Sequence, residues 1–357
     1  MTATNALPII IGHNDTLLSL YLPERGGGRS FFVRSDKGHI DLPRAQEAGL
    51  AGGFFAIFVP PESPGEAAPR LTIKVTEKGY EIPMQAPIDP VYAQRVTIAM
   101  MASLFRLEAA SAGQLKVVRT TGELETCVRE KVLAAILHFE GAEAIGPDLD
   151  ALEVFYQAGL RSLGIVWSRP NIFAEGVPFR YPHSPDTGPG LTNAGKDLVR
   201  ACNDLGIMLD LSHLNEQGFW DVARLSNAPL VATHSNAHTI SPSTRNLTDK
   251  QLAAIKESQG LVGLNFSVGD LRQDGRNDPD VPLAKVVDHI DYLVEQVGID
   301  CIALGTDFDG TRVPLEIGDV TGLPRLIQVL RERGYDEEAL HKLAYQNWIR
   351  VLNKTWK

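Results

Sequence analysis

The chain has 357 residues, 44% of them hydrophobic, and its 34 basic and 44 acidic residues give a net charge of −10. This length suits one large domain or two average ones. The acidic balance and the lack of a basic tract disfavour binding to nucleic acid or to an anionic membrane. Three cysteines without a CxxC pair argue against a disulfide framework and fit a reducing compartment. Because the sequence shows no secretion signal and no apolar run of the ~18 residues that a membrane helix needs, we expect a soluble, cytoplasmic protein.

Eight short apolar runs predict β-strands. Each run is rich in Val, Ile, Leu or Phe and is nearly continuous in hydrophobicity, as expected for strands buried on both faces of a parallel sheet. The predicted strands are residues 8–13, 53–59, 132–139, 160–167, 207–213, 229–234, 260–266 and 301–307.

Helical patterns separate these strands. The predicted helices are residues 89–112, 191–206, 215–226, 247–258, 282–298 and 336–354. Thr192 and Thr248 are candidate N-caps, and Gly206 and Gly298 are candidate helix ends. Repeated strand–helix alternation with eight strands favours an α/β fold, the (β/α)8 TIM barrel. We expect a single domain over residues 1–357, with the final helix covering the barrel.

Three stretches interrupt the alternation as loop insertions after strands 1, 2 and 4. They are residues 21–40, 60–90 and 168–190, which are polar or rich in Pro and Gly. Loops at the C-terminal face of a barrel usually shape the substrate pocket.

Residues with metal-ligand or acid–base chemistry follow the predicted strands. They are His13, Asp15, Glu140, His213, His234 and Asp307. Barrel enzymes carry their active sites at the C-terminal ends of the strands, so these residues should converge on one point although they span most of the chain. The pattern predicts a metal-dependent hydrolase.

The spacing of these residues indicates how each could bind metal. His13 and Asp15 share one face of a strand, and a nitrogen and an oxygen ligand suit a divalent metal such as Zn²⁺. The two oxygens of Glu140 can bridge two cations. His213 and His234 end consecutive strands, which would present them side by side.

Neighbouring residues leave alternatives open. We interpret Glu143 as a solvated charge and His138 as a hydrogen-bonded interior histidine rather than as ligands. Asp210 is expected to support a ligand. Asp307 could move a proton to the leaving amine, and Arg245 could bind a substrate carboxylate or form a surface salt bridge.

Seven sequence segments resemble the membrane (renal) dipeptidase family of zinc peptidases. They are IGHND, HFEGAEAIG, LDLSHLNEQGFWDV, VATHSNA followed by RNLTD, GLVGLNF and GTDFDG. The resemblance runs from about residue 8 to residue 354, and the chain looks like a soluble, bacterial-type member. It implies a (β/α)8 barrel with two Zn²⁺ ions that hydrolyses dipeptides, often with a D-residue at the C-terminal position.

The resemblance also implies a role for each matching residue. His13 and Asp15 would bind one zinc ion, and His213 and His234 the other, with Glu140 as the bridge. Asp307 would be the proton shuttle, and Arg245 would bind the α-carboxylate of the substrate.

The chain departs from the family pattern at the end of strand four. Members commonly carry a histidine that contacts the substrate there, whereas this chain has Trp167 in LGIVWSRPN. An indole N–H donates one hydrogen bond but carries no positive charge. We expect Trp167 to fill part of the substrate pocket, and His183 and Arg169 are alternative donors.

The leading interpretation is a cytoplasmic, zinc-dependent dipeptidase that acts on short peptides through a hydroxide bridging the two metals. A second interpretation keeps the metals but changes the substrate to another amide or a lactam. A third, from a different class, is a metal-binding protein with weak catalysis. The expected partner is a small-peptide substrate, with neither nucleic acid nor membrane, and a homodimer is possible.

Overall fold

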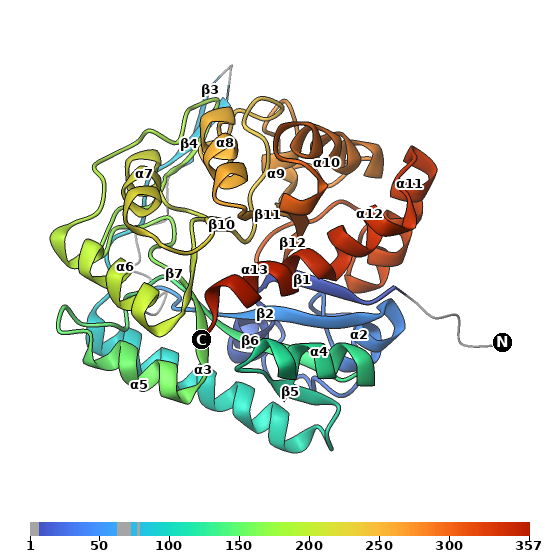
Figure 1. Cartoon of the computed structure of the whole chain (residues 1–357), viewed down its shortest axis with the longest axis horizontal. Helices are drawn as coiled ribbons and strands as arrows, with labels where there is room; N and C mark the ends of the chain where they lie inside the picture. Colours follow the sequence, from blue (N-terminus) through green and yellow to red (C-terminus); the bar gives the residue numbers. More distant parts are fainter. Residues whose placement is uncertain (1–6, 63–72, 77–78) are drawn as a thin grey trace.

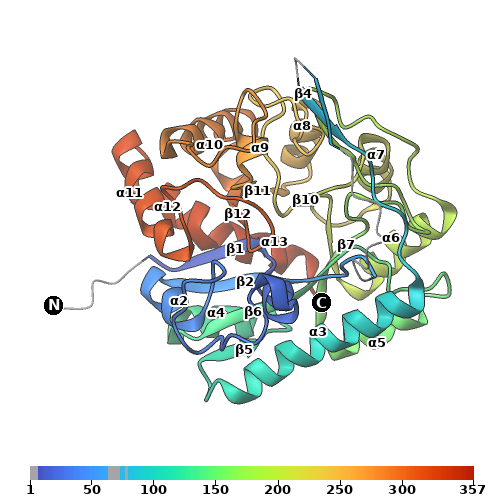
Figure 2. The same cartoon turned by 180° about the vertical axis from the view of Figure 1, so that it is seen from behind.

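The computed structural model describes residues 7–62, 73–76 and 79–357. Eight parallel strands form a closed barrel with helices around it (Figures 1 and 2). In order around the barrel they are β1 (Ile9–Asn14), β2 (Leu50–Phe58), β6 (Leu133–Glu140), β7 (Leu160–Gly164), β9 (Met208–Asp210), β10 (Val231–Ala232), β11 (Leu261–Asn265) and β12 (Ile302–Phe308). Each overlaps one of the eight predicted strands, and the predicted TIM-barrel fold is confirmed.

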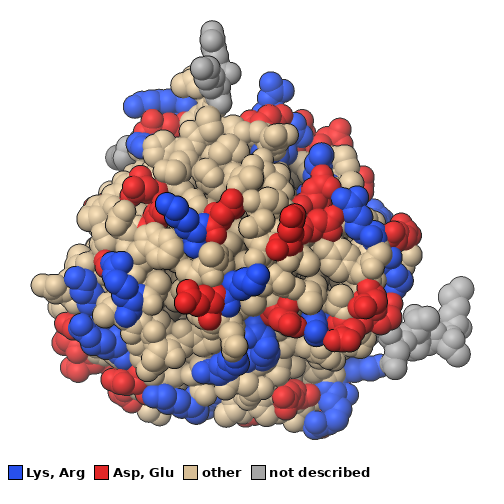
Figure 3. Space-filling view, turned by 45° about the horizontal axis from the view of Figure 1, so that its top comes forward, with Lys and Arg blue, Asp and Glu red and all other residues tan. Residues whose placement is uncertain are grey.

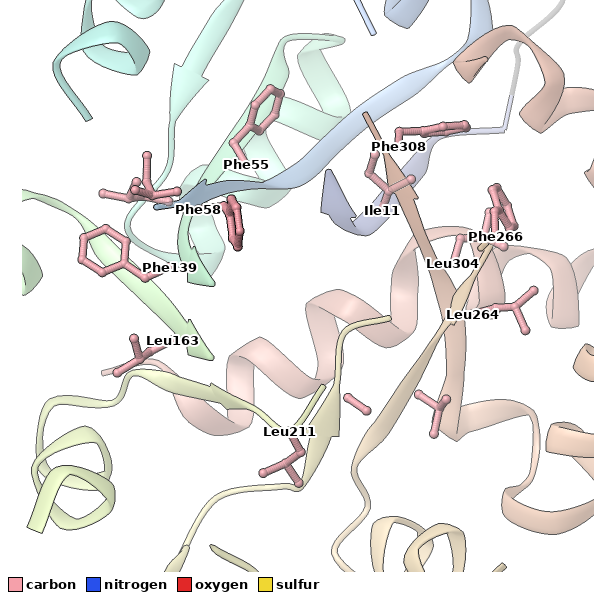
Figure 4. Packing of buried hydrophobic residues seen from close by; sticks show 14 of the residues in the cluster. Ile11, Phe55, Phe58, Phe139, Leu163, Leu211, Leu264, Phe266, Leu304 and Phe308 are labelled. Atoms are coloured by element: carbon pink, nitrogen blue, oxygen red, sulfur yellow. The ribbon is translucent and has the colours of Figure 1, made fainter. Parts of the chain in front are cut away.

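Side-chain alternation along the strands divides the core into two layers. Ile10 and Phe54 point into the barrel and belong to a cluster with Trp348. The next residues, Ile11 and Phe55, belong to the larger cluster between strands and helices, part of which appears in Figure 4. This alternation follows from the two-residue period of a strand and explains why the runs are apolar throughout.

The helices begin and end where their capping residues predict. The predicted helices correspond to α3 (Pro90–Ala110), α6 (Asn193–Leu205), α7 (Glu216–Leu225), α8 (Asp249–Glu257) and α10 (Leu283–Val297). The Thr192 side chain accepts a hydrogen bond from Gly195 N, and Thr248 forms a capping box with Gln251. Gly206 ends α6 in the left-handed conformation at φ 74°, which glycine adopts without steric cost.

The C-terminal helix closes the N-terminal end of the barrel. The predicted helix 336–354 is α12 (Glu337–His341), a π-helical turn (Lys342–Gln346) and α13 (Asn347–Thr355). Trp348 on α13 is fully buried, and its indole Nε1 donates to the Leu304 carbonyl over 3.2 Å. A Cβ on Gly12 would lie 2.4 Å from the Trp348 ring. The glycine therefore makes room for the ring.

Two of the predicted loop insertions contain strands that the sequence patterns did not predict. β3 (Lys74–Thr76), β4 (Gly79–Ile82) and β8 (Phe179–Tyr181) form a small antiparallel sheet. The first two strands come from the insertion after strand 2 and the third from the insertion after strand 4. Tertiary pairing between distant loops leaves no local sequence period. An additional short strand, β5 (Leu115–Val117), pairs with the first half of β6 and was also missed.

The remaining helical segments complete the ring and its loops. They are α1 (Thr16–Tyr21), the 3₁₀ turn Pro23–Arg25, α2 (Leu42–Ala48), α4 (Thr121–Glu130), α5 (Asp150–Ala158), α9 (Val268–Leu271), the 3₁₀ turns Ile299–Cys301 and Val320–Gly322, and α11 (Leu323–Arg333). Within the described part of the chain, no helix has both the length and the apolar character needed to cross a bilayer. Acidic and basic side chains are interspersed on the face shown in Figure 3.

Candidate metal centre

Glu140, the last residue of β6, lies at the centre of the predicted ligands. Its Oε1 is 3.1 Å from His213 Nε2 and 3.6 Å from His234 Nε2. Its Oε2 is 3.7 Å from His13 Nε2, and that nitrogen is 3.3 Å from Asp15 Oδ2. The structure thus brings all five sequence-predicted ligands together at the C-terminal end of the barrel.

Two groups of side chains at this end of the barrel have the spacing to hold an ion. His13, Glu140 and His234 form one group, and His13, Asp15 and Asp307 form the other; within each group the ligand atoms lie within 4.8 Å of one another. Asp15 Oδ1 is buried and has no hydrogen-bond partner among the described residues. Buried polar atoms are normally paired, so this oxygen fits a site that takes up cations.

In His213 and His234, a hydroxyl group contacts Nδ1, the ring nitrogen that does not face Glu140. Ser168 Oγ is 2.9 Å from His213 Nδ1, and Thr233 Oγ1 is 2.8 Å from His234 Nδ1. Thr233 Oγ1 in turn donates to Asp210 Oδ2 over 2.6 Å. These contacts orient both rings so that each Nε2 faces Glu140, in the way that supporting hydrogen bonds fix metal-binding histidines. Asp210 occupies the supporting position that the sequence predicted.

His138 is an interior histidine, as the sequence indicated. Its Nδ1 is 2.9 Å from Ser162 Oγ, and burial lowers its pKa to about 4.

The interpretation of Glu143 as a solvated charge was wrong. Glu143 is buried, and it accepts a hydrogen bond of 2.7 Å from Nε of Arg169, which is itself fully buried. The backbone turns at Gly141, where φ is 97°, and the Glu143 carboxylate packs against this glycine, so that a Cβ there would lie 2.2 Å from Glu143 Oε2. The turn therefore directs a residue beyond the strand end inward.

Asp307 and Arg245 face the same pocket as the predicted ligands. Asp307 Oδ2 accepts a hydrogen bond of 3.0 Å from Asn265 Nδ2. Burial, reinforced by Asp15 and opposed by His13, raises the Asp307 pKa to about 6. Arg245 is buried and donates through Nη2 to the His234 carbonyl over 3.2 Å. This position excludes the alternative of a surface salt bridge.

The site's backbone is strained at two of its predicted residues. His213 and Asp307 both have φ 66°, and Thr306, which is β-branched, has φ 81°. Residues other than glycine rarely adopt this region, and each such position costs of the order of 1–3 kcal/mol. The surrounding barrel therefore holds these side chains in positions that a free chain would not favour.

The carboxylates dominate the electrostatics of the site. Burial lowers the pKa of His13, but Glu140, Asp15 and Asp307 outweigh it and raise that pKa to about 10. Burial lowers the pKa of His213 and His234 well below the usual value. Burial also raises the pKa of Glu140 well above its usual range. The cluster of acids thus favours positive charge at its centre, while His213 and His234 stay neutral, the state in which imidazole binds metal.

A pocket of about 140 Å³ opens onto these residues. Trp167 lines it beside Phe58 and Phe179, with ring centroids 5.0 and 5.6 Å away. The two alternative donors do not line the pocket. Arg169 is paired with Glu143, and His183 Nδ1 lies 2.7 Å from the Ser184 carbonyl.

Sequence reasoning missed several residues of the pocket wall. They are Leu18, Arg25, Phe58, Phe179, Asn265, Ser267, Asp270, Gly310 and Thr311. Asn265 and Phe58 end strands, so the rule that found the predicted ligands could also have found them. Phe179 and Asp270 lie in elements that only the tertiary fold brings to the site.

Comparisons with known proteins identify the family. The sequence model described as "Membrane dipeptidase (Peptidase family M19)" matches residues 2–357. A protein from the pqqA 5′ region of Klebsiella pneumoniae is 50% identical over 271 residues, which are 76% of this chain and 98% of that protein. The crystal structure of a metallopeptidase from Rhodobacter sphaeroides, liganded with a phosphinate mimic of the dipeptide L-Ala-D-Ala, is 51% identical. It has a TM-score of 0.93 and covers 99% of this chain and 100% of its own.

A second solved structure agrees. The dipeptidase AC, a metallopeptidase of family M19, is 50% identical with a TM-score of 0.91, and the match covers 99% of each chain. The fold and site are those of a barrel metallopeptidase. The chain belongs to the membrane dipeptidase family, peptidase family M19, and is a metallodipeptidase that acts on peptide bonds.

The two serine–histidine pairs allow a matched test of the predicted ligand set. If His213 binds metal, Ser168→Ala should lower metal affinity by about 10–100-fold, because the ring loses the contact that orients it. Ser162→Ala removes a contact of the same length from His138 and should leave metal affinity nearly unchanged. Competition with a chromogenic chelator measures both. Equal losses in the two variants would contradict the assignment of His213 over His138.

Proposed function

We propose that the chain is a zinc dipeptidase with two Zn²⁺ ions, one bound by His13 and Asp15 and the other by His213 and His234. The observation that carries this proposal is the orientation of Glu140. Its Oε1 faces His213 and His234, while its Oε2 faces His13. A carboxylate whose two oxygens face different ligand sets is suited to bridge two cations.

The donor set supports zinc. Three imidazole nitrogens and carboxylate oxygens suit this borderline metal, and no cysteine joins the predicted ligands. When bound, two such ions would polarise the scissile carbonyl and supply a nucleophile at neutral pH.

The chain's own residues then position the substrate and move its proton. Arg245, buried in the pocket wall, binds the free α-carboxylate, which restricts substrates to peptides that end within its reach. Asp307 lies in the same pocket, and its carboxylate is held by Asn265. With a pKa near 6, it is suited to take a proton from the attacking water and pass it to the leaving amine.

The preferred substrates are dipeptides with a small residue, including a D-residue, at the C-terminal position. The phosphinate mimic of L-Ala-D-Ala bound to the Rhodobacter sphaeroides enzyme supports this proposal. The catalytic pocket of about 140 Å³ is consistent with compact substrates. Trp167, Phe58 and Phe179 form its aromatic wall, and Trp167 contacts the substrate from the loop that follows β7. Three buried, unpaired cysteines, Cys127, Cys202 and Cys301, support a cytoplasmic location.

A dipeptide panel tests the function directly. The metal-loaded protein should hydrolyse L-Ala-D-Ala and L-Ala-L-Ala, and activity should be lost with a chelator and return with Zn²⁺. Hydrolysis of other amides or a lactam, with no dipeptide cleaved, would instead favour the broader amidohydrolase interpretation. Tight zinc binding without turnover on any of these substrates would favour the metal-binding protein.

The role of Arg245 gives a second prediction. Arg245→Ala should lose on the order of 2–5 kcal/mol of transition-state binding, because the substrate carboxylate loses its buried partner. Amidating the substrate's C-terminus should weaken the wild type by a similar factor but should affect the variant little. The matched control is Arg25→Ala, because Arg25 also lines the pocket but is exposed; this variant should keep the wild type's discrimination between acid and amide. If Arg245→Ala still distinguishes acid from amide as strongly as the wild type does, the assignment is wrong.

A further inference from the structure

A second, larger cavity adjoins the catalytic pocket. It has a volume of about 750 Å³ and lies against the small sheet β3–β4–β8. Phe179, Ser267, Asp270 and Thr311 line both this cavity and the catalytic pocket. We call the larger cavity the vestibule. Because the catalytic pocket offers only about 140 Å³, the vestibule provides the space that a long substrate side chain would need.

Asp270 is an acid at this junction without a cationic partner. It is 7% exposed, and its Oδ1 accepts a hydrogen bond of 2.6 Å from Ser243 Oγ. Among the described residues, its Oδ2 accepts no hydrogen bond and neither oxygen forms an ion pair. The vestibule's other acid, Asp274, is paired with Arg272 at 2.7 Å. A largely buried carboxylate is stabilised by a charged partner, and because Asp270 lines both cavities, a bound ligand can supply that charge.

The position of Asp270 relative to Arg245 indicates which part of the substrate it meets. Ser243 Oγ, which donates to Asp270, also accepts a hydrogen bond of 3.2 Å from Arg245 N. Asn246 Nδ2 donates to the Asp270 carbonyl over 2.8 Å. These contacts join Asp270 to the loop that carries Arg245. If Arg245 binds the α-carboxylate, Asp270 lies on the side of the substrate's C-terminal residue.

We infer that Asp270 selects dipeptides whose C-terminal residue carries a long cationic side chain, such as lysine or ornithine, in addition to small residues. This inference rests on the proposed function. The methylene groups of the side chain would lie against Phe179, which lines both the catalytic pocket and the vestibule. The terminal ammonium would pair with Asp270 Oδ2 at the junction. Burying the methylenes on an apolar wall while pairing the charge is how long cationic side chains are commonly accommodated.

The test compares three dipeptides with the metal-loaded enzyme: L-Ala-D-Lys, L-Ala-D-norleucine and L-Ala-D-Ala. Norleucine has the four-carbon chain of lysine without the ammonium. The wild type should show a kcat/KM for the lysine substrate about tenfold or more above that for norleucine. Asp270→Asn, which keeps the shape and removes the charge, should abolish this preference. Asp274→Asn is the matched control and should keep it, because Asp274 already has a partner in Arg272.

The outcomes separate this inference from the proposed function. Cleavage of L-Ala-D-Ala without a preference for lysine over norleucine overturns the inference alone. An equal loss on all three substrates in Asp270→Asn also overturns it, because Asp270 would then serve a group common to every dipeptide. Failure of the wild type to cleave any of the three overturns the dipeptidase proposal and this inference with it. If Asp270→Asn does not fold, the wild-type comparison still decides, and Asp270→Glu shows whether the retained charge preserves the preference.

Discussion

The carboxylate of Glu140 is buried among other acids, and this constraint shapes the rest of the site. Taking an ionised carboxylate out of water is costly unless a positive charge compensates it. Asp15 and Asp307 add negative charge, and they raise the Glu140 pKa further. The same carboxylates raise the pKa of His13. His213 and His234 remain neutral, and their Nε2 atoms face Glu140. Bound metal would compensate the negative charge of the carboxylates and coordinate the neutral imidazoles together.

The barrel provides the rigidity that such a centre needs. One end is closed by Trp348 and the apolar side chains around it, and the ligands occupy the opposite end of the same strands. The site can therefore hold His213, Thr306 and Asp307 in left-handed backbone conformations, because the strain is small compared with the packing of the whole core. The loops carry the residues to which we assign substrate selection. Arg245 and Asp270 come from segments after β10 and β11, and Phe179 comes from the small sheet.

Sequence patterns predicted the strands and the convergence of the five predicted ligands, and the physical reason is local. Buried parallel strands require continuous apolar runs, and residues that end those runs meet at one end of the barrel, so the proximity of Glu140 and His234 could be predicted from position alone. The prediction failed where tertiary contacts decide. Glu143 follows the same strand as Glu140, but the turn at Gly141 and the distant Arg169 bring it into the interior. The small sheet and Asp270 likewise depend on pairing between loops, which leaves no local period.

The central claim is that Glu140 bridges two metal ions. Anomalous diffraction from crystals of the zinc-loaded enzyme, recorded above and below the zinc edge, tests it most directly. The account predicts two anomalous peaks, a few ångströms apart as in other two-metal sites (about 3.5–4 Å), with one oxygen of Glu140 directed at each. One peak would lie beside His13 and Asp15 and the other beside His213 and His234. A fully active, zinc-loaded crystal with a single peak, or with two peaks that Glu140 does not join, would contradict it.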